Sequence, residues 1–244
     1  MFVISIAGLD IGIDNRYDFV LKMCNGYLTD KEPLFTVRVS REKIAEELEK
    51  KNPEVSLTDP EGYVESIWLY REICRRLPKY NAFLFHSAAI EYKGRAYLFS
   101  APSGTGKTTH IRLWRKNFGK AIDIINGDKP ILRRDENGVF YACGTPWCGK
   151  ERWQENRTAP VAAVCFLARG EKNTAEEMPK SDAASALFGL VVYPTDPADA
   201  MRLLSLADDF LMKTPVYRLY CNMENEAAFL AFRTLTGETE PPLD

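Results

Sequence analysis

The sequence is poor in histidine, with two in 244 residues, and none of its six cysteines forms a Cys-x-x-C motif. A zinc site is therefore not indicated, because such sites are built from closely spaced cysteines and histidines. No repeat or low-complexity segment stands out. A basic excess is also missing, since the formal net charge is −2 and the isoelectric point is near 5.9. Nucleic-acid and membrane-surface binding, which depend on a basic field, are not expected.

Long apolar runs are missing as well. The apolar stretch at residues 1–8 is too short to span a bilayer, and the first basic residue is Arg16, so the charged region of a signal peptide is not present. We therefore expect a cytoplasmic protein. With 45% hydrophobic residues, the chain can bury a full core as one large domain, or as one domain with a small appendage.

The cysteines are scattered along the chain. Cys165 and Cys221 lie in apolar runs and are expected to be small buried side chains. Cys143 and Cys148 flank the sequence Gly-Thr-Pro-Trp and could form a redox pair. The alternative is that both remain thiols, as is usual in the cytosol.

Residues 101–109, Ala-Pro-Ser-Gly-Thr-Gly-Lys-Thr-Thr, are the most informative segment. An apolar and aromatic run precedes them, and a helix-compatible run that ends at Gly119 follows. The segment matches the phosphate-binding loop G-x-x-x-x-G-K-[ST], except that Ala101 stands in place of the first glycine. We expect this loop to bind the phosphates of ATP or GTP, and the alternative is an ordinary glycine-rich turn.

The residues of this loop have separate expected roles. Gly104 and Gly106 let successive backbone N–H groups point inward, and the helix N-terminus adds positive potential. Lys107 reaches the outer phosphates, and the hydroxyl of Thr108 can bind Mg²⁺. The predicted nucleotide-binding residues are Ser103, Gly104, Thr105, Gly106, Lys107, Thr108 and Thr109.

A histidine is expected beside this loop. Two β-type runs, residues 82–92 and 95–100, flank a Lys-Gly pair that suits a two-residue hairpin turn. In that register Ala88 faces Phe99, and His86 falls opposite the start of the loop. We favour a role for His86 in the site, and the alternative is a polar residue that interrupts a buried strand.

An aspartate is expected on the other side of the loop. Residues 121–126 read as a strand, and the sequence Asn-Gly-Asp-Lys-Pro continues from its end. The end of a strand that follows a phosphate-loop unit is the usual place for an acid that holds Mg²⁺, directly or through water. Asp128 is our candidate for binding Mg²⁺ or Mn²⁺, and the alternative is an ordinary turn aspartate.

A third segment, residues 144–153, is rich in glycine and tryptophan and carries two basic side chains, Lys150 and Arg152. It suits contact with a phosphorylated ligand or an acidic acceptor, and we take Arg152 as a candidate catalytic residue. An equally acceptable interpretation is a structured turn with solvated charges.

The expected fold class is α/β, with a mixed β-sheet that carries a phosphate-binding loop and is flanked by helices. Residues 1–80 are expected to form an N-terminal β/α portion packed on the core, residues 81–236 the nucleotide-binding core, and residues 237–244 a loose tail. Strands are predicted at residues 2–6, 34–39, 131–134, 139–141, 161–167 and 214–221, and helices at residues 41–51, 59–77, 180–192, 199–213 and 224–235.

Three of these motifs together resemble a known superfamily. His86 on a strand, the loop Ser-Gly-Thr-Gly-Lys-Thr-Thr and the sequence Asn-Gly-Asp-Lys-Pro are similar to features of HPr kinase/phosphorylase and ATP-dependent phosphoenolpyruvate carboxykinase. The resemblance covers residues 82–167 and extends to small HPr-kinase-like proteins of bacteria. It implies the nucleotide-binding core of these enzymes.

The resemblance also implies roles for single residues. Lys107 would neutralise the transferring phosphate, Thr108 and Asp128 would hold the metal, and His86 would lie near the γ-phosphate or the metal. From these roles we expect an ATP- and Mg²⁺-dependent phosphotransferase that acts on a hydroxyl of a protein, peptide or small molecule. These families usually show two adjacent acids, whereas Gly127 precedes Asp128 here. The alternatives are a non-catalytic ATP-binding regulatory module, which Gly127 favours, and a carboxykinase-like lyase.

Overall fold

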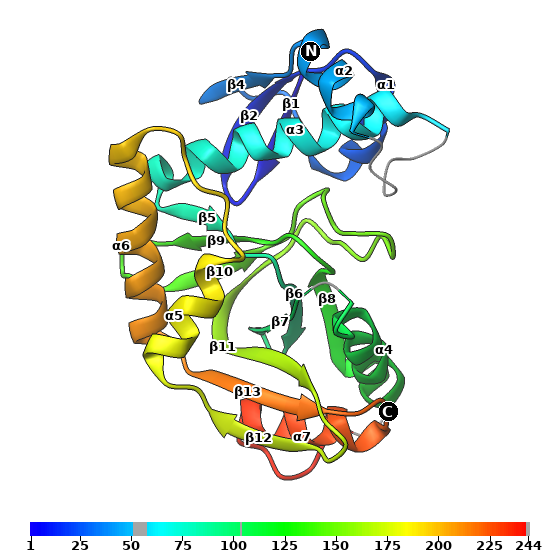
Figure 1. Ribbon diagram of the computed structural model, residues 1–244, viewed down its shortest axis with the longest axis vertical. Helices are drawn as coiled ribbons and strands as arrows, with labels where there is room; N and C mark the ends of the chain where they lie inside the picture. The colour runs from blue at the N-terminus through cyan, green and yellow to red at the C-terminus, as the bar shows by residue number, and fades with distance from the viewer. Residues whose placement is uncertain (51–57, 103, 243–244) are drawn as a thin grey trace.

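The computed structural model describes residues 1–50, 58–102 and 104–242, which form two β-sheets with helices packed around them (Figure 1). The smaller sheet has the order β3-β1-β2-β4 and consists of β1 (Phe2–Ile6), β2 (Leu9–Asp14), β3 (Leu28–Thr29) and β4 (Phe35–Arg38). The larger sheet has the order β5-β9-β10-β11-β7-β6-β8, and β13 extends it by pairing with β11 and β12. The fold is therefore mixed α/β.

The described residues of the N-terminal part contain three helices, of which the last two begin where capping residues predict. They are α1 (Asp18–Met23), α2 (Arg41–Glu49) and α3 (Pro60–Arg76), with a 3₁₀ turn at Asn25–Tyr27. The Ser40 hydroxyl accepts a hydrogen bond from the backbone of Lys43, and the Asp59 carboxylate accepts one from Gly62, which satisfies free N–H groups at the starts of α2 and α3. Helix α2 was expected to reach Lys51, which lies outside the described residues.

The larger sheet confirms the predicted hairpin and corrects its first strand. Its strands are β5 (Ala82–Leu84), β6 (Ala88–Tyr92), β7 (Arg95–Ser100), β8 (Ile122–Asn126), β9 (Ile131–Arg134), β10 (Phe140–Cys143), β11 (Thr158–Arg169), β12 (Thr174–Glu177) and β13 (Val216–Cys221). In the β6–β7 hairpin Ala88 lies opposite Phe99, as predicted. Residues 82–92 are not one strand, however, because β5 pairs with β9 and β6 pairs with β7 and β8.

Five of the described strands of the larger sheet run in the same direction, namely β7, β8, β9, β11 and β13. Strand β7 is parallel to β11, and β11 is parallel to β13. Strand β8 also runs with β7, since both are antiparallel to the β6 strand between them. The carboxyl ends of β8, β7, β11 and β13 therefore lie along one edge of the sheet, which is where α/β sheets bind ligands.

Helices cover both faces of the larger sheet. They are α4 (Lys107–Phe118), α5 (Lys180–Phe188), α6 (Pro197–Lys213) and α7 (Asn225–Thr236), with 3₁₀ turns at Leu77–Tyr80 and Gly119–Ala121. Successive side chains of β7 face opposite ways. Tyr97 and Phe99 pack with Trp114 of α4 and Phe232 of α7, whereas Leu98 belongs to the cluster on the α5 and α6 face.

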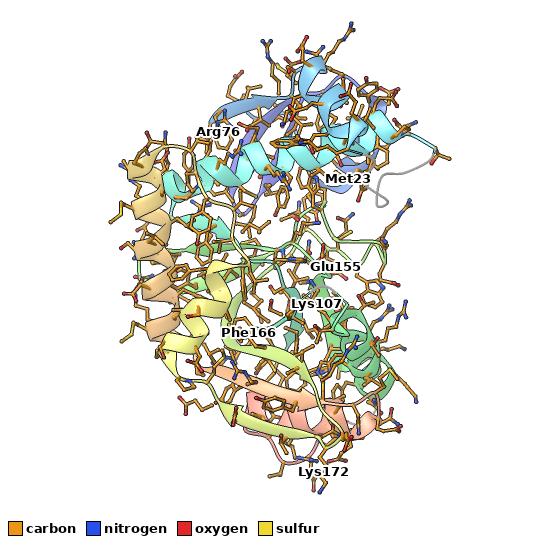
Figure 2. The ribbon with its side chains drawn as sticks, in the orientation of Figure 1. Met23, Arg76, Lys107, Glu155, Phe166 and Lys172 are labelled. Carbon is orange, nitrogen blue, oxygen red and sulfur yellow. The ribbon has the colours of Figure 1, made fainter. Side chains whose placement is uncertain are left out.

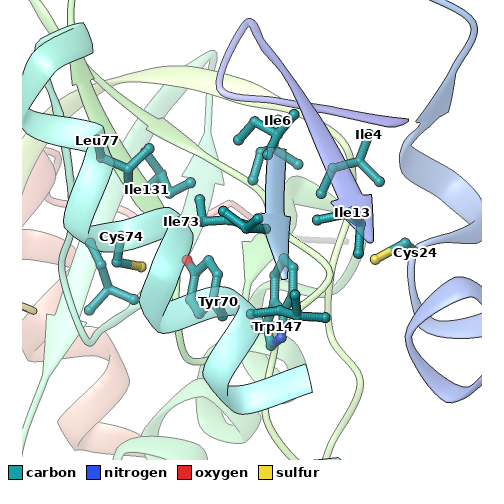
Figure 3. Close-up of a cluster of buried hydrophobic side chains, with 14 of the residues drawn as sticks. Ile4, Ile6, Ile13, Cys24, Tyr70, Ile73, Cys74, Leu77, Ile131 and Trp147 are labelled. Atoms are coloured by element: carbon teal, nitrogen blue, oxygen red, sulfur yellow. The ribbon is translucent and has the colours of Figure 1, made fainter. Parts of the chain in front are cut away.

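The two sheets share an apolar cluster beneath α3 (Figure 3). Isoleucines of β1 and β2, such as Ile4 and Ile13, belong to the same buried cluster as Ile73 of α3. Ile131 and Trp147 join it from the larger-sheet part of the chain. Residues 1–80 therefore pack on the rest of the protein through a continuous hydrophobic core.

The described end of the chain, residues 237–242, contains no helix or strand. Glu238 in this segment accepts hydrogen bonds from Tyr92 and Lys93 at the β6–β7 turn. In the part of the chain that the structure describes, no helix is both long and apolar enough to cross a membrane.

Candidate functional site

The topology brings three of the predicted site segments to the same edge of the larger sheet. Residues 101–106, here called the glycine loop, follow the carboxyl end of β7, and Asp128 follows that of β8. His86 lies two residues before β6, and because β6 is antiparallel to β7 and β8 its starting end lies at this edge too. The main chain of His86 is fixed there, since its carbonyl accepts a hydrogen bond from the Ser100 hydroxyl at 2.8 Å.

Asp128 is the centre of a charged cluster. Its Oδ1 accepts a hydrogen bond from Lys107 Nζ at 2.7 Å and lies 2.9 Å from His86 Nε2, while its Oδ2 lies 3.0 Å from Lys129 Nζ. Lys107 is the first residue of α4 (Figure 2), and its side chain is only 12% exposed. We call these four residues, His86, Lys107, Asp128 and Lys129, the Asp128 cluster.

Burial and charge act against each other in this cluster. Burial alone would raise the pKa of Asp128, but the hydrogen bond from His86 and the charges of Lys107 and Lys129 hold that pKa well below its usual range. The pKa of Lys107 is lowered, because desolvation of its ammonium group outweighs the attraction of Asp128. Asp128 is thus ionised at neutral pH. A further anion beside Lys107 would stabilise the charged form of its ammonium group.

The glycine loop contains two glycines in left-handed backbone conformations. Gly104 and Gly106 adopt φ values of 78° and 123°, which favour glycine, and α4 begins immediately after the loop. Arg169, at the carboxyl end of β11, donates a hydrogen bond of 2.6 Å to the Gly104 carbonyl. The predicted contact residue Ser103 lies outside the described residues. The other predicted residues, Thr105, Thr108 and Thr109, are partly buried in the loop and the first turn of α4.

The turn that carries Asp128 is organised by a residue that the sequence did not single out. The fully buried Asn126 accepts backbone hydrogen bonds from Asp128 and Lys129 at 2.8 and 2.7 Å. Its amide group donates to the carbonyls of Thr145 and Trp147. Asn126 therefore links the Asp128 turn to the following loop. Its position in the motif Asn-Gly-Asp-Lys-Pro was the available signal.

Gly127 is needed for close packing. A Cβ at this position would lie 2.9 Å from the carbonyl oxygen of Cys148 and 3.4 Å from the Cβ of Trp153. Its backbone N–H also donates to the carbonyl of Trp153 at 2.8 Å. A side chain at position 127, such as the second acid of the resembling families, would therefore require the Cys148 backbone to shift.

Helix α3 also contacts the Asp128 turn, which the sequence did not indicate. The hydroxyl of Tyr70 donates to the Lys129 carbonyl at 2.7 Å, and the Tyr70 ring stacks on Trp147 with centroids 4.3 Å apart. Trp147 in turn donates from its indole to the Ser66 carbonyl of α3 at 2.9 Å. The N-terminal part of the protein thus supports the site directly.

The segment 144–153 divides into a buried half and an exposed half. Thr145 and Trp147 are buried and fix the Asp128 turn, whereas Lys150 and Arg152 are exposed. In the described parts of the chain, Arg152 makes no side-chain hydrogen bond or ion pair. The structure does not bring the predicted catalytic Arg152 into the Asp128 cluster, because its side chain is turned to solvent. Lys129 does belong to the Asp128 cluster, although it was not among the site residues predicted from the sequence.

The possible redox pair is not formed. Cys143 and Cys148 are both free and buried. Burial raises the pKa of each thiol to about 11, so neither is a reactive thiolate at neutral pH. These cysteines act as small packing residues.

The fold and the site define a mixed α/β protein with a cluster of charged and titratable side chains, the Asp128 cluster, at the carboxyl edge of its larger sheet. Residues 56–231 match the family model described as SynChlorMet cassette protein ScmC, and the chain belongs to this family. It is a family other than the two that the motifs resemble. No curated protein matches the chain in sequence.

Among solved structures, the chain is similar to the Hpr(Ser) kinase/phosphatase from Coxiella burnetii. The two are 13% identical, and the match covers 53% of this chain and 88% of that chain with a TM-score of 0.28. A similarity of this strength carries no argument about activity.

Proposed function

We propose that the protein is a phosphotransferase that uses ATP and Mg²⁺ to phosphorylate a hydroxyl of a protein, peptide or small molecule. The supporting observation is the Asp128 cluster beside the glycine loop: a buried lysine, an ionised carboxylate and a histidine meet at the start of a helix. Phosphoryl transfer requires mainly positioning and charge neutralisation, which these groups offer.

In this proposal the Lys107 ammonium group leaves the Asp128 carboxylate and binds the outer phosphates of the nucleotide. The exchange suits a lysine whose pKa is lowered by burial, because a triphosphate offers several anionic oxygens in place of one carboxylate. Backbone N–H groups of the glycine loop and the first turn of α4 would hold the remaining phosphate oxygens.

His86 is the proposed base. When His86 Nε2 carries the hydrogen and donates it to Asp128 Oδ1, Nδ1 of the neutral ring is an acceptor. The acceptor hydroxyl would give its proton to Nδ1 as its oxygen bonds to the γ-phosphorus, and the bond to the leaving diphosphate would break. Asp128, kept ionised, would stabilise the imidazolium that forms. This arrangement needs no acid at position 127.

The chain offers oxygen ligands that suit Mg²⁺, namely the Asp128 carboxylate and the Thr108 hydroxyl. The ion would neutralise charge on the phosphates when it is bound. Lys129 now contacts Asp128 Oδ2, so this ammonium group would have to move away for that oxygen to bind the metal.

A second candidate is a non-catalytic ATP-binding module that regulates a partner. The close packing around Gly127 favours it, because a second carboxylate there would require the Cys148 backbone to shift.

Incubation of the purified protein with γ-labelled ATP, Mg²⁺ and a cell extract separates the two candidates. The phosphotransferase is supported if the wild type labels an acceptor and the His86→Gln variant does not. The control variant Arg152→Gln, which changes an exposed residue, should still label the acceptor. Tight ATP binding without label in any acceptor, and without ATP hydrolysis, would instead select the regulatory module.

A further inference from the structure

The glycine loop has a pocket on the flank opposite the Asp128 cluster. This pocket has a volume of about 470 Å³ and is lined by Thr105 and Thr109 of the loop and α4, and by residues at the ends of β11 and β13, among them Arg169 and Met223. None of the four residues of the Asp128 cluster lines it. Along the sheet edge the order is therefore cluster, glycine loop, pocket.

Size and lining suit a flat organic group more than a phosphate. Small-molecule pockets in proteins usually measure about 300–1,000 Å³. Leu167 and Met223 give the wall apolar surface, and Met223 is 77% exposed, so an occupant could cover it. Arg169 also lines the pocket, and its guanidinium donates a hydrogen bond to the Gly104 carbonyl; a guanidinium is planar and can stack on a ring.

His110 adds an imidazole ring to the pocket lining, and its hydrogen bond with Trp114 shows which ring nitrogen carries the hydrogen. Trp114 Nε1 lies 3.1 Å from His110 Nε2, and since an indole nitrogen only donates, Nε2 must be an acceptor. With Nε2 accepting this hydrogen bond, the ring hydrogen of His110 is on Nδ1. This Nδ1–H is buried and has no partner among the described residues, although His110 lines the pocket.

An unpaired buried N–H is costly, so an acceptor that reaches it would bind favourably. Arg169 also offers only donors. The Thr105 and Thr109 hydroxyls can donate as well as accept, so the lining suits a ligand with acceptor atoms on its rim, such as the ring nitrogens and carbonyls of a nucleobase or the oxygens of a ribose.

We propose that this pocket binds the nucleoside part of the nucleotide, with His110 and Met223 as residues that determine its affinity. The proposal rests on the proposed function, because the phosphates must occupy the glycine loop. The terminal phosphate then points toward Lys107 and His86, and the acceptor approaches from the Asp128 side of the loop.

The test compares ligands that share phosphates but differ in the nucleoside. Dissociation constants are measured for ATP, GTP and inorganic tripolyphosphate with the full chain. The wild type is expected to bind at least one purine nucleotide about tenfold or more tightly than tripolyphosphate, a difference of about 1.4 kcal/mol. Met223→Ser should reduce this ratio several-fold and leave tripolyphosphate binding unchanged. Met212→Ser, at another exposed methionine on α6, is the matched control and should change neither.

His110 is tested by two variants whose folding is followed by thermal melting. His110→Leu removes the donor and should also reduce the ratio, whereas His110→Gln, which can accept from Trp114 and donate with its amide, should recover part of it. Equal affinities for nucleotides and tripolyphosphate, or a ratio that Met223→Ser leaves unchanged, would overturn the inference and leave the proposed function standing. If neither nucleotides nor tripolyphosphate bind, the proposed function fails and the inference with it.

Discussion

Lys107 Nζ and Asp128 Oδ1 lie 2.7 Å apart, although the residues belong to different strand-to-loop connections of the sheet. Lys107 is the first residue of the helix after β7, and Asp128 lies in the turn after β8. Because β6 separates these two strands, the ion pair spans the sheet edge from one side of His86 to the other. The proposed phosphate site is thus closed by an internal pair that an anionic ligand must open.

Lys107→Ala is expected to abolish stabilisation of the protein by ATP and Mg²⁺. A ligand at 100 times its dissociation constant adds about 2.7 kcal/mol to the unfolding free energy, and this is visible as a higher melting temperature. Lys93→Ala, which removes an exposed lysine at the β6–β7 turn, is the control and should keep the full shift. If the Lys107→Ala protein keeps it too, the nucleotide binds elsewhere.

Asp128→Asn is expected to weaken the Mg²⁺ dependence of ATP binding and to retain the fold. The fold should persist because the turn is held by Asn126 through the backbone of residue 128, which the substitution leaves in place. In the absence of metal, tripolyphosphate should bind more tightly than to the wild type, since Lys107 no longer has a carboxylate partner. Titration with and without Mg²⁺ measures both effects. A variant that fails to fold would make Asp128 a structural residue.

Gly127→Asp is expected to destabilise the protein without increasing phosphotransfer. The new Cβ would meet the Cys148 carbonyl, and overpacking of this kind costs about 1–3 kcal/mol. Melting temperature and turnover are measured together, with Gly127→Ala as the control that adds the same Cβ and no charge. Higher turnover in a well-folded Gly127→Asp protein would contradict the proposed role of His86 as the base.

Tyr70→Phe is expected to weaken nucleotide binding although residue 70 lies in the N-terminal part. The variant keeps the ring that stacks on Trp147 and loses the hydrogen bond to the Lys129 carbonyl, a net contribution of about 0.5–1.5 kcal/mol. Tyr27→Phe is the matched control, because the buried Tyr27 hydroxyl has no partner among the described residues. Equal ATP affinities in both variants would show that the Tyr70 contact does not position the site.

His110 is expected to make the fold sensitive to mild acid. Its pKa is about 3 in the folded protein against 6.5 for a free histidine, so between these values the unfolded chain binds the additional proton. Stability should therefore rise with pH across that window and be lost progressively as pH falls from 6.5 toward 3. Chemical denaturation at pH 7 and pH 5 should show a larger loss for the wild type than for His110→Gln. Identical losses would mean that His110 is already protonated or exposed.

Local patterns in the sequence predicted the parts of the site that lie on short connections. The Lys-Gly turn fixed the β6–β7 register, because a two-residue hairpin turn leaves one pairing for the residues around it. The glycine loop and the helix that follows it up to Gly119 were predicted from the sequence in the same way. The sequence placed His86 beside the glycine loop, where the structure also has it, but predicted one continuous strand through it. In the structure β5 ends at Leu84 and β6 begins at Ala88, so His86 lies between two strands.

Contacts between distant segments could not be predicted in this way. Tyr70 and Lys129 are 59 positions apart, and nothing in the pattern of α3 indicates which of its buried side chains ends at the Asp128 turn. The closure around Gly127 depends on Cys148 and Trp153, which approach only after the following loop has folded back. Exposure of Arg152 likewise depends on tertiary packing, which composition does not reveal.

The cluster around Trp147 has a consequence for any attempt to divide the protein. Leu84, Ile131 and Trp147 are covered by residues of the first 80 positions, with which they form one buried group. A chain engineered to start at residue 81 would present these side chains to water as a contiguous apolar patch, and such patches promote self-association. The expected fate of that fragment is aggregation, even though it would contain the complete larger sheet.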